Sequence, residues 1–246
     1  MVVESNGQLY TSPPITEAVI EVRLSKLLTD AKLQKARDFI ASRYENSRSE
    51  PMLEGTLHFD TQSATFEQLG MRHTLSSADE TDRCVLSPKS LAWTRLAPYP
   101  GWVVFAERFE TDFRAVFKAT GPLPISRLGL RYVNRIDVEP VEGLAHYEEF
   151  LNFRIEHGDL LEPTSGFQWI IVKDFPALKL KANVMSAVVE PEIMGWSSFA
   201  FDIDVYCNIE VPQTIDDIQA KLKSMRELKN TIFEAGITER ARRMYT

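Results

Sequence analysis

The segment from Arg127 to Asp137 alternates between polar and apolar side chains, and this alternation constrains the fold more than any other part of the chain. One set of alternate positions holds Arg127, Gly129, Arg131, Arg135 and Asp137, and the other holds Leu128, Leu130, Tyr132 and Ile136. Because successive side chains of a β-strand point to opposite faces, the pattern predicts a strand with one buried face. Three arginines would then lie in a row on the other face.

A second alternating segment lies near the start of the chain, between Glu17 and Ser25. Its apolar positions are Ala18, Ile20, Val22 and Leu24, whereas Glu17 and Glu21 belong to the opposite face. We expect the two strands to pair in antiparallel fashion, centred on Val19 and Gly129. The facing pairs in that register are Glu17 with Arg131 and Glu21 with Arg127. The sequence therefore predicts ion pairs between neighbouring strands.

Each half of the chain shows the same order of predicted elements. Residues 1–122 begin with the first strand, which is followed by a helix that starts after Thr29 and ends before Pro51. Three or four antiparallel strands then lie between Leu53 and Leu96, and an aromatic-rich helix starts at Trp102. Residues 123–246 begin with the strand at 125–138, which is followed by a helix-like segment at 142–154. Three strands follow at 167–175, 178–188 and 199–209. A last helix starts after Thr214 and ends with Arg240, Arg242 and Arg243.

A short sequence match supports a relation between the two halves. The residues Pro14, Ile15, Thr16 and Glu17 correspond to Pro124, Ile125, Ser126 and Arg127 at the same place in the second half. We therefore predict an α+β protein built by internal duplication, with two halves related by a pseudo-twofold axis and joined in one compact unit. The order of elements is similar to that of helix-grip and TATA-binding-protein-like folds, in which a curved antiparallel sheet wraps around a long helix.

Composition excludes several classes of protein and partner. The formal net charge of -7 makes nucleic acid and anionic membranes improbable partners.

Cys84 and Cys207 are far apart in the sequence, which indicates neither a disulfide framework nor a thiolate metal site and favours a reducing cytoplasm. The first residues do not have the pattern of a secretory signal, and no apolar run is long enough to span a bilayer. Common catalytic and phosphate-binding motifs are absent, so neither catalytic residues nor a cofactor are predicted.

The row of arginines allows two interpretations. A ligand-binding interpretation makes the row an anion site at the centre of the molecule, and its residues are Arg127, Arg131, Arg135, Glu17, Glu21 and Asn134. The structural interpretation, which we favour, makes it a ladder of ion pairs that holds the two halves together. Asp202 and Asp204 lie on one face of another predicted strand and form a candidate metal site, although two carboxylates alone are fewer ligands than a hard cation takes. The interpretation that we favour for them is a pair of aspartates that are solvated or paired with arginines.

Two motifs carry a resemblance to a known group of proteins. The first includes Pro13, Pro14, Ile15, Glu17 and Ala18, and the second runs from Gly129 through Ile136 as GLRYVNRI. The chain resembles, over nearly its whole length, an uncharacterised and sporadically distributed family of bacterial and archaeal proteins. The resemblance implies no particular reaction. A patchy distribution is typical of accessory genes, such as those of defence or toxin–antitoxin-like cassettes, and so implies a role that depends on a partner.

The function that we expect is a non-enzymatic interaction or regulatory role with a protein partner, and a homodimer is a further possibility. An alternative is a phosphate- or nucleotide-directed enzyme or sensor that uses the central face of arginines and carboxylates. Its weakness is that Glu17 and Glu21 do not have the ExExK spacing of triphosphate-tunnel enzymes. A third hypothesis is a carrier of apolar ligands in a cavity between sheet and helix.

Overall fold

The structure, a computed structural model, describes residues 3–5, 8–58, 60, 62–140, 146–154 and 166–246. Its main element is a nine-stranded antiparallel sheet with the order β4-β5-β6-β7-β3-β8-β11-β10-β9. These strands are β3 (Ile15–Leu24), β4 (Asn46–His58), β5 (Ser63–Ser76), β6 (Asp82–Leu86), β7 (Ser90–Leu96), β8 (Ile125–Val138), β9 (Gln168–Phe175), β10 (Leu180–Val189) and β11 (Ser197–Cys207). A separate two-stranded ribbon contains β1 (Val3–Ser5) and β2 (Gln8–Tyr10). The predicted α+β class is confirmed.

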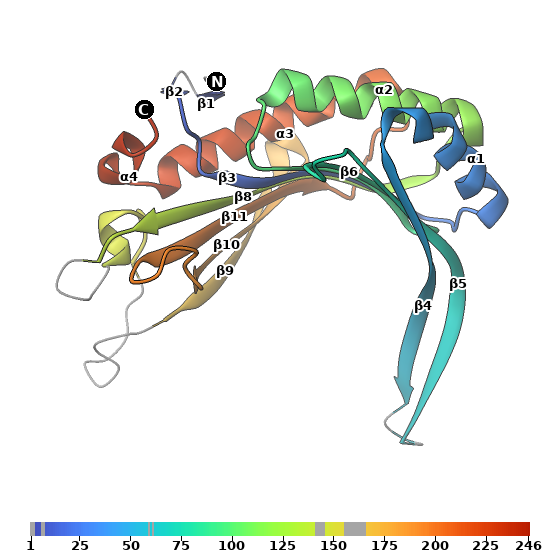
Figure 1. Cartoon of the computed structure of the whole chain (residues 1–246), viewed down its shortest axis with the longest axis horizontal. Coiled ribbons are helices and arrows are strands. Elements are labelled where there is room, and N and C mark those ends of the chain that lie inside the picture. The colour runs from blue at the N-terminus through green and yellow to red at the C-terminus, as the bar shows by residue number, and fades with distance from the viewer. Residues whose placement is uncertain (1–2, 6–7, 59, 61, 141–145, 155–165) are drawn as a thin grey trace.

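The sheet is strongly curved, and its helices lie over the convex face (Figure 1). The helices are α1 (Asp30–Ile40), α2 (Trp102–Thr120), α3 (Ile215–Gly236) and α4 (Glu239–Arg243), and short 3-10 turns occupy 41–43, 147–149 and 176–178. Over the concave face the described residues place no helix (Figure 1). In the same described part of the chain, none of the helices combines the length and the apolar composition needed to cross a membrane.

The hydrophobic core lies between the convex face of the sheet and helices α2 and α3. Helix α2 buries Phe105, Phe109 and Phe113 on one stripe because these residues recur every four positions. The ring of Trp93 on β7 contacts this stripe edge-on, at 5.0 Å from Phe109 and 5.9 Å from Phe113 between ring centroids. The aromatic residues of α2 therefore fill the core, and Trp93 itself is completely buried.

The two strands at the centre of the sheet, β3 and β8, pair in antiparallel fashion as predicted, but their register differs from the expected one. Val19 lies opposite Arg131 and not opposite Gly129, so the strands are shifted by two residues. Buried Ile20 and Leu130 lie opposite each other in this register, which places two large core side chains side by side. Because the shift is even, the side chains between Glu17 and Arg23 keep their predicted faces.

Local capping signals identified two helix starts correctly. The hydroxyl oxygen of Thr29 accepts a hydrogen bond from the backbone N–H of Lys32, and that of Thr214 accepts one from the backbone N–H of Asp217. At its other end α3 stops at Gly236, and the three C-terminal arginines lie on the separate helix α4. A Cβ atom at Gly236 would lie 2.3 Å from the ring of Phe201, so this helix end packs unusually close to the sheet.

Two predicted boundaries were wrong. Pro51 does not break the chain, because it lies inside β4, an edge strand in which a residue without N–H is tolerated. The predicted helix at 142–154 is absent from the described residues 146–154, which contain only a short 3-10 turn, and residues 141–145 lie outside the described part. Leu151 instead forms an antiparallel bridge with Ile237, so tertiary contacts override the local helical pattern.

Candidate functional site

The concave face of the sheet carries the predicted row of arginines, at the junction of β3, β8 and β11. The guanidinium of Arg127 lies 2.7 Å from Glu21 and 2.6 Å from Asp204, and it stacks on the ring of Tyr206 at 4.4 Å. Its side chain is only 13% exposed. The predicted ion pair between Glu21 and Arg127 is therefore present, and Asp204 is a second carboxylate partner of Arg127.

Arg131 and Arg135 also have carboxylate partners. Arg131 donates bidentate hydrogen bonds to the carboxylate of Asp202, from Nε to Oδ1 at 2.9 Å and from Nη2 to Oδ2 at 2.6 Å. These hydrogen bonds raise the pKa of the guanidinium. Arg135 contacts Asp137 at 2.8 Å and Glu192 at 2.9 Å. We call these three arginines and their carboxylate partners the arginine ladder. All three positive charges of the ladder are thus neutralised within the chain.

The expected ion pair between Glu17 and Arg131 does not form. Glu17 lies opposite Val133 in the observed register. The guanidinium of Arg131 instead forms an ion pair with Asp202 on the neighbouring strand β11. Among the described residues, Glu17 acts on Arg131 only as a more distant negative charge that contributes to the raised pKa. The two-residue shift between β3 and β8 is the physical reason for this difference.

Asp202 and Asp204 point to the same face, as predicted, but each carboxylate forms an ion pair with an arginine. Burial raises the pKa of the Asp204 carboxyl, and the positive charge of Arg127 opposes this effect. Within the described ranges, no cluster of three or more histidine, cysteine, aspartate or glutamate side chains could hold a metal ion. The carboxylates of this face are arranged as partners of arginines, which is the geometry that an ion-pair ladder requires.

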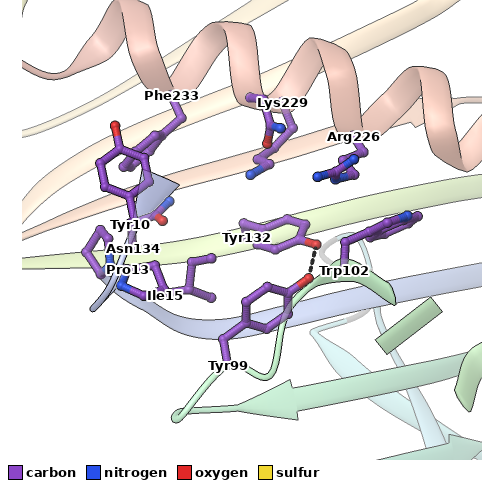
Figure 2. A pocket seen from close by; sticks show the side chains of 12 residues that line it. Tyr10, Pro13, Ile15, Tyr99, Trp102, Tyr132, Asn134, Arg226, Lys229 and Phe233 are labelled. Atoms are coloured by element: carbon purple, nitrogen blue, oxygen red, sulfur yellow. Dashed lines mark hydrogen bonds between the residues drawn. The ribbon is translucent and has the colours of Figure 1, made fainter. Parts of the chain in front are cut away.

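A small cavity lies on the other face of the same two central strands, below α3 (Figure 2). Its volume is about 20 Å³, so it admits only a small ligand. The polar residues that line it are Tyr10, Tyr99, Tyr132, Asn134, Arg226, Lys229 and Asn230. The hydroxyl oxygens of Tyr99 and Tyr132 are 2.7 Å apart, and both side chains are buried. This cavity is a second candidate site.

Lys229 is the unusual residue of the cavity, because only 7% of it is exposed. Its ammonium group lies 4.2 Å from the centroid of the Tyr132 ring. Burial lowers the pKa of Lys229 to about 7, and the nearby charge of Arg226 acts in the same direction. No described carboxylate forms an ion pair with this ammonium group. A buried amine that is only partly protonated near neutral pH is typical of functional sites.

Sequence reasoning identified Asn134 but missed the rest of this cavity. The amide nitrogen of Asn134 donates a hydrogen bond to the carbonyl oxygen of Phe201 at 2.9 Å, which satisfies it structurally. Lys229 could have been found from its spacing, since it lies four residues from Met225 and from Phe233 on the buried stripe of α3. A lysine within an otherwise apolar stripe indicates a buried charge, but a search for apolar periodicity passes over it.

Comparison with models of known protein families found no match, and a search of curated proteins found no similar sequence. The resemblance of the two motifs to a sporadically distributed family therefore stays a prediction.

Proposed function

We propose that the protein is a non-enzymatic interaction component that binds a protein partner through the hairpin of β4 and β5. The observation that carries this proposal is the hairpin of β4 and β5, which extends well beyond the helices (Figure 1). We call this hairpin the arm. A two-stranded ribbon is marginally stable on its own in water and gains stability from a surface that packs against it.

The arm exposes a continuous apolar strip formed by Leu53, Leu57 and Phe66. Phe66 lies opposite Gly55, and the two leucines flank that glycine at alternate positions, so all three side chains share one face. The ring of Phe66 covers the backbone of Gly55, a contact that also supports the hairpin itself. Phe66 nevertheless stays 75% exposed, and the leucines are more than half exposed. Exposed apolar strips of this kind mark interaction surfaces.

The charge of the arm indicates the chemistry of the partner. Within the arm, residues 46–76, the carboxylates are Glu50, Glu54, Asp60 and Glu67, and the two arginines, Arg48 and Arg72, both contact Glu50. Glu54 forms an ion pair with Lys89, and Glu67 lies directly opposite Glu54. A partner with a basic and partly apolar surface would complement the remaining negative charge of the arm and cover the strip.

The arginine ladder gives less support to the alternative of a phosphate- or nucleotide-directed enzyme or sensor. Each arginine of the ladder already has a carboxylate partner, and a phosphate would have to displace it. The hypothesis of a carrier of apolar ligands has similarly weak support. The aromatic stripe of α2 packs against Trp93, so it fills the space between sheet and helix that such a ligand would need. The proposal of a protein partner needs no such rearrangement.

A photo-crosslinking amino acid at position 66 is expected to capture a distinct protein partner in the native host. The double change Leu53→Ser and Leu57→Ser removes apolar contact area next to that position without touching the core. We expect it to weaken partner binding by roughly 2 kcal/mol, about thirtyfold, as for central apolar contacts of an interface. The measurement is the yield of crosslinked product, with the folded state checked by thermal unfolding.

A crosslinker at Val103 provides the matched control, since Val103 is 64% exposed but lies on α2 over the convex face. Equal capture from both positions, or capture of a second copy of this chain alone, would contradict the proposal. Crosslinks from position 66 that persist at full yield in the double variant would contradict it as well.

The internal duplication is also part of our proposal. Support comes from the strand order, in which β7 and β3 on one side of the centre correspond to β11 and β8 on the other. Further support comes from the long helices α2 and α3, which follow β7 and β11 in the chain and cover the same face (Figure 1). Two halves, 1–122 and 123–246, in a TATA-binding-protein-like order would account for this arrangement.

A further inference from the structure

The cavity below α3 brings positive charge and hydrogen-bond donors together in a buried place. Figure 2 shows Lys229 and Arg226 reaching from α3 toward Tyr132, whose hydroxyl is hydrogen-bonded to that of Tyr99. Each tyrosine hydroxyl carries one hydrogen, and the pair uses only one of them in its mutual hydrogen bond. The second hydroxyl hydrogen is available for an acceptor in the cavity.

Among the residues that line the cavity there is no aspartate or glutamate to supply that acceptor. The nearest negative charge that acts on Lys229 is Glu234, but this carboxylate accepts hydrogen bonds from Tyr10 at 2.9 Å and from Arg242 at 3.0 Å. The ring of Tyr132 offers the ammonium group a favourable but weaker contact. A buried ammonium group without a counter-ion is costly, so an anion is the partner that fits it best.

The protonation of Lys229 is linked to such a partner. Burial is the main cause of its lowered pKa, Arg226 on α3 lowers it further, and Glu234 opposes both. Tyr132 on β8, Tyr99 before α2 and Tyr10 on β2 face the cavity as neutral groups, because burial raises their pKa values. An anion beside Lys229 favours the charged form and so binds best below neutral pH.

We propose that this cavity binds one small monovalent anion, a chloride ion or a carboxylate the size of formate, between the ammonium group of Lys229 and the free hydroxyl hydrogen of the Tyr99–Tyr132 pair. The volume of about 20 Å³ sets the size of the ligand and excludes large anions. This ligand would bridge α3 and the centre of the sheet, where the two halves meet.

The test compares anions on the full chain at fixed ionic strength, with sodium gluconate replaced stepwise by sodium chloride or sodium formate at a pH below neutral. We expect the melting temperature to rise with saturation for at least one of the small ions. The affinity should fall roughly tenfold for each pH unit above the pKa of Lys229, as the ammonium group loses its proton.

The change Lys229→Met keeps an unbranched side chain and removes the buried charge, so this variant is expected to fold and to lose anion affinity roughly tenfold or more. Lys223→Met, an exposed lysine on the same helix, is the matched control and should behave as the unchanged chain. Should Lys229→Met fail to fold, Tyr99→Phe removes one hydroxyl and should also weaken the response. Identical melting curves in gluconate and in both small ions, or a small-ion response that Lys229→Met retains, would overturn the proposal.

Discussion

Replacement of Asp112 by alanine is expected to lower the free energy of unfolding by roughly 3 to 5 kcal/mol, because it removes the acceptor of a buried polar network. The carboxylate of Asp112 is completely enclosed between α2, β7 and the turn after α1. It accepts hydrogen bonds from the indole nitrogen of Trp93 at 3.1 Å, from Arg43 at 2.8 Å and from the hydroxyl of Tyr44. Alanine would leave the donors of Trp93 and Tyr44 buried without partners. Equilibrium unfolding in urea measures the loss.

Glu110→Ala on the same helix is the control for this prediction. Glu110 pairs with Arg114 at the surface, where both side chains are well hydrated, so its removal should cost about 1 kcal/mol or less. Asp112→Asn keeps one acceptor oxygen and should lie between the two variants. If Asp112→Ala loses no more stability than Glu110→Ala, the network does not hold α2, β7 and the turn after α1 together in the way that its geometry indicates.

The sequence was sufficient for elements whose pattern is local. Strand β8 was predicted with its observed ends because its side chains alternate over the whole segment Ile125–Val138. Helix α2 was predicted from the spacing of its aromatic residues, and α3 from the capping pair Thr214 and Asp217. In each case the signal lies within one element and needs no knowledge of its neighbours.

Features that depend on neighbours in space were not predictable in the same way. The partners of the arginine ladder include Asp202 and Asp204 because β11 pairs with β8, and one sequence does not specify which strand is the neighbour. The network of Asp112 joins residues 68 positions apart, and nothing in the local pattern connects Asp112 with Tyr44. The cavity was missed for the same reason, since Lys229 acquires its environment only when α3 lies on the sheet.

The second large effect is expected for Arg127→Met, which should lower the free energy of unfolding by roughly 2 to 4 kcal/mol, whereas Lys179→Met should cost about 1 kcal/mol or less. Arg127 is 13% exposed and neutralises Glu21 and Asp204 together, so its removal leaves two carboxylates near each other in a partly buried place. Lys179 pairs with Glu210 at the surface, where both side chains are more than half exposed, so water replaces much of that contact. Urea unfolding at neutral pH measures both variants. An equal loss of stability for the two variants would contradict the ladder interpretation.

The pH dependence of the Arg127→Met variant tests the same interpretation by a different route. Burial raises the pKa of Asp204 above its usual 3.8, and the loss of Arg127 would raise it further. A carboxyl with a raised pKa binds more protons in the folded state, so its contribution to stability falls as the pH rises from 3.8 through the raised value. The deficit of the variant should therefore be largest at neutral pH and should shrink as the pH falls toward 4. A deficit that is constant with pH would mean that Arg127 stabilises the sheet through its packing on Tyr206, and not through its charge.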